Sequence, residues 1–381
     1  MVRPKRRSRA GALVVARPKR RSRAGALVVR PKRRSPAGVL VVRLTPSHDP
    51  PRAKDQTPMT HPPVPFDPEL AAALSALGDQ VPTTITPEMI ALARDNASGV
   101  MAPPSDEEIS LGGTYAVTER TVPGPAGDPD ISLLICTPVG ADGPRPAIYH
   151  THGGGMILGD NRSGIVDVVE TASRYQAVVV SVEYRLAPEA PHPGPIEDVY
   201  AGLAWTAENA GELGIDPDRI VILGGSAGGG LTAALGLLAR DRGGPAVFGQ
   251  MLMCPMLDDR NDTVSSVQMT GRGVWDHTAN ATGWGALLGD AAGGPDVSPY
   301  AAPARATDLS GLPPTFVDVG SAETFRDEDV AYATGIWQAG GRAELHVWPG
   351  GYHGFDAFAP TAAVSQDAKA ARIHWLDRLL A

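Results

Sequence analysis

Cysteine and long apolar runs are both scarce in this sequence. The 381 residues include two cysteines, Cys136 and Cys254, which could form at most one disulfide and lie in no cluster of metal-binding residues along the chain. A disulfide-stabilised scaffold is therefore excluded, and a reducing compartment is the default. No run of about 18 apolar residues occurs, so no transmembrane helix is expected. These absences predict a cytoplasmic protein without a membrane partner.

Lysine is almost absent outside the first 58 residues. Four of the five lysines lie within residues 1–58, and only Lys369 lies beyond them. Residues 1–58 also hold 17 of the 34 Lys and Arg residues but only two of the 42 acidic residues, so they carry a formal charge of +15 and the remainder carries −23. The acidic remainder is not expected to bind nucleic acid or other polyanions.

The basic segment repeats one block three times. The sequence Arg-Pro-Lys-Arg-Arg-Ser occupies residues 3–8, 17–22 and 30–35, and each copy precedes a short run of Ala, Gly, Leu and Val. The spacing is too short for a solenoid unit, and each apolar run is too brief to build a core. The segment is therefore not expected to fold as a domain.

Three interpretations of residues 1–58 stay open. Clustered Lys and Arg could bind nucleic acid or an anionic membrane by neutralising phosphates. A secretion signal is a second interpretation, although the apolar stretch 10–16 is short before charge returns at Arg17. The third is a translated DNA repeat upstream of a natural start at or near Met59. We favour the third, and expect residues 1–58 to be a disordered or non-native extension.

The remainder of the chain has the character of a globular protein. Hydrophobic residues make up 43% of the whole chain and charged residues 20%, which is enough apolar surface for a sizeable core. Helix start signals at Asp67 and Thr86, each followed by proline, predict two short helices within a segment spanning residues 59–112. A Gly- and Pro-rich stretch follows at 112–129.

Short apolar strands then alternate with helices through residues 113–381. Strands are predicted at 131–136, 147–151, 177–182, 220–223, 250–254, 315–319 and 345–348. Helices are predicted at 196–208, 227–240, 327–339 and 363–380. Such alternation is typical of an α/β fold, with a parallel sheet covered by helices on both faces and function at the carboxyl ends of its strands.

Two glycine motifs follow predicted strands. Residues 224–228 read Gly-Gly-Ser-Ala-Gly, a G-x-S-x-G pattern in the strand-to-helix context that it requires. Residues 152–155 read His-Gly-Gly-Gly, a motif whose backbone N–H groups complete an oxyanion hole. A phosphate-binding loop is the alternative, but no G-x-G-x-x-G fingerprint follows the first strand. Ser226 is therefore the candidate nucleophile.

Acyl transfer by a serine needs a base and an acid that orients it, in the order Ser, acid, His for this fold. Of the nine histidines, His346, His353 and His374 come late enough in the chain. His353 is the candidate base, because it lies in a Gly-rich loop just past a strand. Glu323 is the candidate acid, because it is nearest the end of the preceding strand. Residues 327–329 instead begin the next helix, where negatively charged side chains are stabilised by the positive N-terminal end of the helix dipole.

These motifs, together with Glu-Tyr-Arg-Leu-Ala-Pro-Glu at 183–189, resemble the bacterial hormone-sensitive-lipase-like (family IV) esterases of the α/β-hydrolase superfamily. The resemblance covers roughly residues 67–380. It implies an α/β-hydrolase fold with a mostly parallel central sheet, and a helical cap from residues 59–112 over a catalytic domain at 113–381. Segment 183–189 is expected to be structural, shaping the loop behind the site.

The resemblance also assigns roles to single residues. The oxyanion hole would be formed by the backbone N–H groups of Gly154, Gly155 and Ala227, with His152 ordering the loop by hydrogen bonding. The acid would stand at Glu323. This sequence departs from the family pattern twice, because the family usually has Asp in place of Glu323 and Asp or Thr in place of Gly225.

The expected activity is that of a serine carboxylesterase, which hydrolyses a small-molecule ester with a short-to-medium acyl chain through an acyl-enzyme and needs no metal or organic cofactor. Hydrolysis of a lactone, amide or carbamate on the same residues is an alternative. A non-catalytic small-molecule receptor on a hydrolase scaffold is a more remote one. The oligomeric state is open, and a homo-oligomer is compatible with the sequence.

The resemblance also makes Met269, Trp275 and Trp284 candidate walls of the substrate pocket, although buried aromatic residues more often form plain core.

Removal of residues 1–58 is expected to leave folding and activity unchanged, because this segment is compositionally foreign to the rest of the chain. Circular dichroism, thermal unfolding and hydrolysis of a p-nitrophenyl ester would compare the truncated chain with the full-length one. An insoluble or inactive truncated protein would show that the segment belongs to the functional unit.

Overall fold

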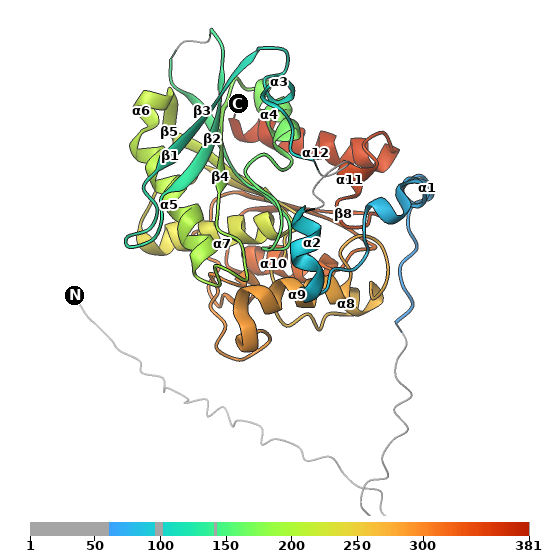
Figure 1. The fold of residues 1–381 in the computed structure, drawn as a ribbon. Helices are drawn as coiled ribbons and strands as arrows, with labels where there is room; N and C mark the ends of the chain where they lie inside the picture. Colours follow the sequence, from blue (N-terminus) through green and yellow to red (C-terminus); the bar gives the residue numbers. More distant parts are fainter. Residues whose placement is uncertain (1–60, 96–101, 141–142, 381) are drawn as a thin grey trace, which may run out of the picture. The chain divides into compact units, whose positions relative to one another are not determined.

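An eight-stranded sheet forms the centre of the part of the chain that the computed structural model describes, residues 61–95, 102–140 and 143–380 (Figure 1). Its strands lie in the order β1-β2-β4-β3-β5-β6-β7-β8. The strands are β1 (Tyr115–Val122), β2 (Ile131–Pro138), β3 (Arg145–Thr151), β4 (Val178–Glu183), β5 (Ile215–Gly225), β6 (Gly249–Met253), β7 (Thr315–Gly320) and β8 (Ala343–Trp348). Strand β2 pairs antiparallel with β1 and β4, and the other neighbours are parallel. The sheet is mostly parallel, as predicted.

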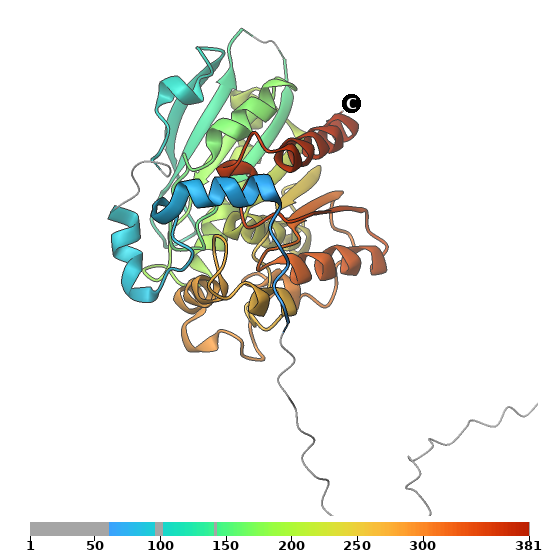
Figure 2. The ribbon, with the colours of Figure 1, turned by 90° about the vertical axis from the view of Figure 1, so that its right-hand side faces the viewer.

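Helices cover both faces of this sheet (Figures 1 and 2). One face packs against α5 (Gly194–Glu208), α7 (Ala227–Arg242) and α10 (Arg326–Gln338), and the other against α4 (Ile165–Ser173) and α12 (Ala363–Leu380). The remaining helices are α1 (Pro68–Leu77), α2 (Ile90–Asp95), α3 (Asp106–Ile109), α6 (Ala210–Leu213), α8 (Val264–Gln268), α9 (His277–Leu288) and α11 (Phe355–Phe358). Short 3₁₀ helices occupy Gly78–Gln80, Pro87–Met89, Gly289–Ala291 and Pro303–Arg305.

Alternate side chains of the central strands pack into different cores. In β5, Ile220 and Ile222 belong to the core against α5 and α7, whereas Val221 and Leu223 belong to the core against α4 and α12. Successive side chains of an extended strand point to opposite faces. Because both faces are covered there, residues 220–223 of β5 form a continuous apolar run in the sequence.

All seven predicted strands and all four helices predicted between 196 and 380 are present, with ends shifted by a few residues. Strand β1 and the helices α3, α4, α6, α8, α9 and α11 are absent from the sequence-based prediction. Strand β1 lies in the Gly- and Pro-rich stretch 112–129, and only its end residues Tyr115 and Val122 are buried. The apolar run that marks a central strand is therefore missing there.

The N-terminal helices begin where the sequence predicts. Asp67 Oδ1 accepts hydrogen bonds from the N–H groups of Glu69 and Leu70 at 2.8 and 3.3 Å, and α1 begins at the next residue, Pro68. Leu70 packs with Tyr352 and Phe355 in one buried cluster. Helix α1 is therefore anchored beside the loop that follows β8, next to α11 (Figure 2).

The basic extension predicted at 1–58 lies outside the described residues, as do residues 59–60 and 96–101 of the predicted cap segment. Those predictions stay predictions. Within the described ranges, every helix is too short or too polar to span a bilayer.

Candidate active site

Ser226 lies in a tight turn between β5 and α7. Its backbone has φ 58° and ψ −126°, a conformation that a residue with a Cβ seldom adopts and that costs on the order of 1–3 kcal/mol. The Ser226 N–H donates to Met253 O at 2.8 Å, and the N–H groups of Gly230 and Met256 donate to Ser226 O at 3.0 and 2.9 Å. These hydrogen bonds hold the turn at the carboxyl edge of the sheet.

The glycines after Ser226 let α7 approach the sheet closely. A Cβ on Gly228 would lie 2.0 Å from Thr151 O, and a Cβ on Gly230 would lie 2.1 Å from Met256 O. Both obstacles are backbone atoms, which cannot move aside without shifting the chain. The glycines are therefore a steric requirement, because the end of β3 packs directly on the first turn of α7.

His353 lies between Ser226 and Glu323. His353 Nε2 is 2.9 Å from Ser226 Oγ, and His353 Nδ1 is 2.5 Å from Glu323 Oε1. A carboxylate only accepts, so Nδ1 carries the proton and Nε2 is left to accept the hydrogen bond from the serine hydroxyl. Glu323 is 1% exposed and His353 8% exposed. The three side chains selected from the sequence thus form one hydrogen-bonded chain, in which the acid and the base are buried and the serine is partly exposed.

Glu323 and His353 come from loops after neighbouring parallel strands. Glu323 follows β7 and His353 follows β8. The two loops contact each other directly, because the Ala322 N–H donates to Gly351 O at 3.0 Å. A Cβ on Gly320 would lie 2.0 Å from the same carbonyl oxygen. The acid and the base are therefore positioned as one unit.

The alternative acids at 327–329 make other contacts. They lie in the first turn of α10, as predicted. Asp327 Oδ2 accepts from the Ser265 N–H at 2.8 Å, and Glu328 Oε1 accepts from the Leu257 N–H at 2.7 Å. Burial raises the pKa of Glu328 and of Asp329 well above the usual range. Among the hydrogen bonds of the described residues, none joins these acids to His353.

A buried ion-pair network supports the His353 loop. Arg372 of α12 donates to Asp318 of β7 at 2.9 Å and to Asp356, three residues after His353. Asp318 also accepts from Trp348 Nε1 at 3.1 Å. Burial favours the neutral acid at Asp356, but the charge of Arg372 and its hydrogen bond outweigh this and lower the pKa of that carboxyl. The loop is thereby tied to the sheet and to the C-terminal helix.

The loop of residues 152–155 lies against the serine. A Cβ on Gly153 would be 3.4 Å from Ser226 Cβ. Gly154 has φ 113°, and a Cβ there would lie 2.1 Å from Leu158 O, so only glycine fits. Within the described part of the chain, no hydrogen bond to another protein group is donated by the backbone amides of Gly154, Gly155 and Ala227. Unpaired N–H groups beside a serine can accommodate a developing anion.

His152 and Tyr184 brace this loop. His152 Nδ1 donates to Gly153 O at 2.8 Å, a hydrogen bond to the loop in which the family resemblance gives His152 an ordering role. The Tyr184 ring stacks on the His152 ring with 4.1 Å between centroids, and its hydroxyl donates to His152 O at 2.9 Å. Burial lowers the pKa of His152 to about 4, so its ring is neutral at neutral pH. Arg185 is held by two hydrogen bonds to buried Asp198, at 2.8 and 2.7 Å.

Two aromatic side chains lie around the histidine and the glycine loop. A Cβ on Gly155 would be 1.9 Å from Trp275 Cη2, so the indole rests directly on that glycine. The ring centroid of Trp275 is 6.5 Å from that of His353, and Phe325 meets His353 edge-on at 5.2 Å. Of the other proposed pocket walls, Met269 and Trp284 are at most 2% exposed, and Trp284 belongs to the main core. Phe325 was not anticipated, because nothing local marks it.

Cys254 lies beside the acid and the base in space, although it belongs to no cluster along the chain. Its sulfur, a carboxylate oxygen of Glu323 and a ring nitrogen of His353 all lie within 4.8 Å of one another. Among the described residues this is the one group of three potential metal ligands. Burial, reinforced by the nearby charge of Glu323, raises the pKa of the Cys254 thiol well above its usual range. The thiol is therefore protonated at neutral pH.

Comparison with known proteins identifies the fold and the family of this chain. A family model described as an alpha/beta hydrolase fold matches residues 148–357, more than half of the chain. The chain is an α/β-hydrolase. Carboxylesterase NlhH of Mycobacterium tuberculosis is 34% identical over 329 residues, which cover 84% of this hydrolase and 99% of the relative. Esterase LipI of the same species is 33% identical over 66% of this chain and 78% of its own.

Solved structures place the hydrolase in the same group. "Bacterial Heroin Esterase" is 40% identical with a TM-score of 0.76, and the match covers 83% of this hydrolase and 98% of that chain. Esterase LipW from Mycobacterium marinum is 32% identical with a TM-score of 0.73 and the same coverage. The hydrolase is thus a member of the hormone-sensitive-lipase-like (family IV) esterases, a family of carboxylic ester hydrolases.

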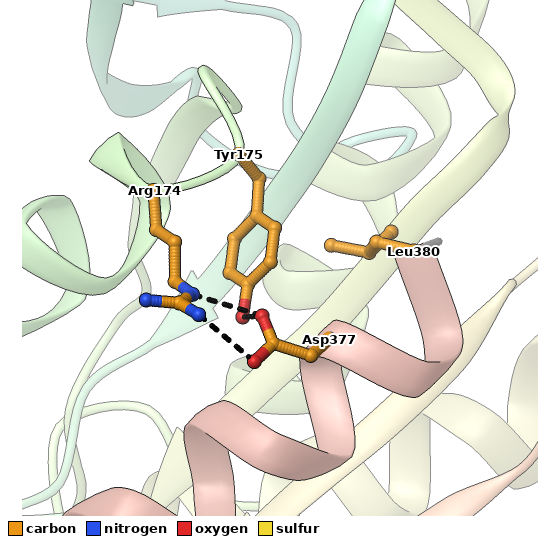
Figure 3. Close-up of a pocket in the computed structure, with 4 residues that line it drawn as sticks. All are labelled: Arg174, Tyr175, Asp377 and Leu380. Carbon is orange, nitrogen blue, oxygen red and sulfur yellow. Dashed lines mark hydrogen bonds and ion pairs between the residues drawn. The ribbon is translucent and has the colours of Figure 1, made fainter.

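Two surface hollows of the hydrolase lie away from Ser226. One, of about 360 Å³, is lined by Arg174, Tyr175, Asp377 and Leu380 (Figure 3). Asp377 Oδ1 accepts from both Arg174 Nε at 2.8 Å and the Tyr175 hydroxyl at 3.0 Å, so these polar groups satisfy one another. Arg174 and Tyr175 come directly before β4 in the chain, so this hollow lies at the amino edge of the sheet, opposite Ser226. The other, of about 960 Å³, is lined by parts of 128–132 and 183–197 with Arg94, and neither hollow is lined by Ser226, Glu323 or His353.

Gly225 is a departure of this hydrolase from the family pattern, and the structure has room for a side chain there. A Cβ on Gly225 would lie 3.7 Å from Met253 Cε and 3.8 Å from Met253 O, which are ordinary contact distances. The backbone of Gly225 is not in the left-handed region. The turn at Ser226 is held by backbone hydrogen bonds instead of by a side chain at position 225.

Gly225→Ala is therefore expected to stabilise the folded hydrolase by about 0.4–1 kcal/mol, because alanine has fewer unfolded conformations to lose. Urea unfolding at neutral pH measures the change. Gly228→Ala is the matched control and is expected to destabilise strongly, since its Cβ would collide with Thr151 O. A loss of stability in Gly225→Ala would contradict the argument.

Proposed function

We propose that this chain is a serine carboxylesterase that hydrolyses small-molecule esters with short-to-medium acyl chains through an acyl-enzyme intermediate. The observation that carries the proposal is the continuous chain from Ser226 Oγ through His353 to Glu323, with contacts of 2.9 and 2.5 Å. The names of the relatives, carboxylesterase and esterase, support an ester as the substrate.

In the proposed reaction, Ser226 Oγ attacks the ester carbonyl carbon while His353 Nε2 takes the hydroxyl proton. Glu323 stabilises the imidazolium that forms. The tetrahedral intermediate collapses, the C–O bond to the alcohol breaks, and His353 returns the proton to the departing alkoxide. Water then attacks the acyl-enzyme with His353 as base again, releasing the acid and restoring Ser226.

The oxyanion of each tetrahedral intermediate would be stabilised by the amides of Gly154, Gly155 and Ala227. These donors come from two separate loops and are not engaged by another protein group within the described chain. Donors that are already oriented need no reorganisation when the negative charge develops, so they stabilise the transition state more than the ground state. His152 would act here only through the loop that it orders.

The N-terminal segment 61–95 would form the cap over this site. Hydrogen bonds join it to the His353 loop, to the segment that holds Trp275 and to the chain just after the glycine motif. The Asp67 N–H donates to Gly350 O at 3.1 Å, the Asp276 N–H donates to Thr83 O at 3.1 Å, and Arg94 Nε donates to Ile157 O at 2.7 Å. These contacts support a segment that closes over the substrate and limits the depth of the pocket.

The triad is expected to act as a unit. Ser226→Ala should lower kcat for a p-nitrophenyl ester by a factor on the order of 10⁴ or more, because the nucleophile is lost while binding is kept. Glu323→Gln should also lower kcat strongly, because an amide cannot offset the charge of the imidazolium. Steady-state hydrolysis at neutral pH measures both effects.

Asp327→Asn is the matched control for the acid, since Asp327 lies near Glu323 in the chain but bonds to Ser265. It is expected to retain most of the wild-type kcat. Near-normal hydrolysis by Ser226→Ala would contradict the proposed mechanism. An inactive Asp327→Asn variant together with an active Glu323→Gln variant would show that Glu323 is not the acid of the triad.

Trp275 is expected to limit the length of the acyl chain. Its indole rests on Gly155 and lies close to His353, and its backbone is fixed by a hydrogen bond of 2.8 Å from Thr324 Oγ1 to Trp275 O. Trp275→Ala should raise kcat/KM for the octanoate ester relative to the acetate ester about tenfold or more. Each further methylene that enters the enlarged pocket stabilises the transition state by roughly 1 kcal/mol or more.

The measurement is a series of p-nitrophenyl esters from acetate to palmitate. Trp284→Phe is the control, because Trp284 shares the core cluster of Trp275 but makes no ring contact with His353 among the described residues, so its replacement should leave the order of preference unchanged. An unaltered chain-length profile in a folded Trp275→Ala variant would show that Trp275 does not bound the acyl pocket.

A further inference from the structure

The thiol of Cys254 has no part in the proposed reaction, yet it lies within 4.8 Å of ligand atoms from both Glu323 and His353. A sulfur, an imidazole nitrogen and a carboxylate oxygen together form the kind of donor set that holds Zn²⁺ in proteins. Cys254 is partly exposed at the end of β6, on the same edge of the sheet as Ser226. Solvent therefore reaches part of this residue, as it reaches part of Ser226.

We propose that Cys254, Glu323 and His353 form an inhibitory site for a thiophilic divalent cation, of which Zn²⁺ is the representative. Zinc bonds of about 2.0–2.3 Å in a tetrahedral arrangement place neighbouring ligand atoms roughly 3.3–3.7 Å apart. The three atoms lie within 4.8 Å of one another already. Side-chain movements of about 1 Å would complete the site, with water as the fourth ligand.

Glu323 offers an oxygen for this purpose. Its Oε1 accepts the hydrogen bond from His353, while its Oε2 is buried and has no hydrogen-bond partner among the described residues. A buried carboxylate oxygen without a partner is costly, and coordination to a cation satisfies it. The surroundings favour a cation as well, because the carboxylates of Asp318 and Asp356 lie near the thiol with Arg372 as their counter-charge.

Cation binding at this site is incompatible with the proposed catalysis. Both ring nitrogens of His353 are engaged, Nδ1 by Glu323 and Nε2 by Ser226. Coordination of either nitrogen breaks one of these two hydrogen bonds, whichever side the ion takes. On binding, the Cys254 S–H bond is replaced by an S–metal bond and that proton passes to the buffer. Where Nδ1 of His353 is the ligand, its proton moves to Nε2, so the ring stays neutral. Hard cations such as Mg²⁺ are excluded as inhibitors, because they require more oxygen ligands and avoid sulfur.

The first experiment titrates Co²⁺, as a spectroscopic substitute for Zn²⁺, into the full-length, reduced chain. Thiolate coordination produces an intense charge-transfer band in the near ultraviolet, and the chain has only two cysteines that could cause it. One equivalent of Co²⁺ is expected to produce the band, and Zn²⁺ is expected to abolish it by displacement. Cys254→Ser should lose the band, whereas Cys136→Ser, which alters the buried cysteine of β2, should keep it.

The second experiment measures inhibition of p-nitrophenyl ester hydrolysis by Zn²⁺, each variant being compared with its own metal-free rate. Inhibition of the wild type should be reversed by EDTA, and Cys254→Ser and Cys254→Ala should need at least tenfold more Zn²⁺. Mg²⁺ should have no effect. Equal sensitivity of the wild type and both folded variants, or a Co²⁺ band that survives in Cys254→Ser, would overturn the proposal.

The inhibition rests on the proposed esterase function, but the Co²⁺ titration does not. Ser226→Ala removes the nucleophile and none of the three ligands, so it should keep the charge-transfer band. A chain that hydrolyses no ester but shows the Cys254-dependent band would refute the function and retain the metal site. An active esterase without the band would refute the metal site and retain the function.

Discussion

The left-handed backbone of Ser226 is the constraint around which the rest of the site is arranged. A residue with a Cβ is held at φ 58° only where its surroundings permit little else. Here three adjacent parallel strands meet. The turn begins at the end of β5, its N–H is bonded to Met253 of β6, and Gly228 presses against the last carbonyl of β3. Backbone contacts with the middle strands of the sheet therefore hold Ser226 in its strained conformation.

The parallel arrangement explains how residues far apart in the chain reach this turn. All carboxyl ends of parallel strands lie at the same edge, so the loops after β3, β5, β7 and β8 are neighbours there. The glycine loop comes from the first of these, Ser226 from the second, Glu323 from the third and His353 from the last. Asp318, Asp356 and Arg372 then join the last two loops to α12 by ion pairs, and Tyr184 braces the first. Each contributor to the site is thus fixed by a contact outside it.

Much of this arrangement could be predicted from the sequence, because its signals are local. A strand buried on both faces is a continuous apolar run, and a turn that excludes every Cβ must be built of glycine, as at Gly228 and Gly154. Glu323 could be preferred to the acids at 327–329 from its position before the helix, and its hydrogen bond to His353 agrees with that choice. What could not be predicted depends on contacts between distant segments. Strand β1 has an exposed, polar middle, Phe325 has no local pattern, and Cys254 comes near His353 only because β6, β7 and β8 are consecutive in the sheet.

Glu323 illustrates how an apparently unfavourable residue can serve the proposed chemistry. The carboxylate is buried, and one of its oxygens has no hydrogen-bond partner among the described residues. An incompletely solvated carboxylate destabilises the resting protein, by about 1–3 kcal/mol for the missing partner. The same carboxylate interacts most favourably with a positive charge, and in the proposed reaction His353 becomes positive only when it has taken the proton of Ser226. Stabilisation that appears with the imidazolium lowers the barrier, because it is absent from the ground state. The longer glutamate side chain is therefore compatible with the role that aspartate usually has in this family, and its unsatisfied oxygen is available to the proposed cation site beside the thiol and the imidazole.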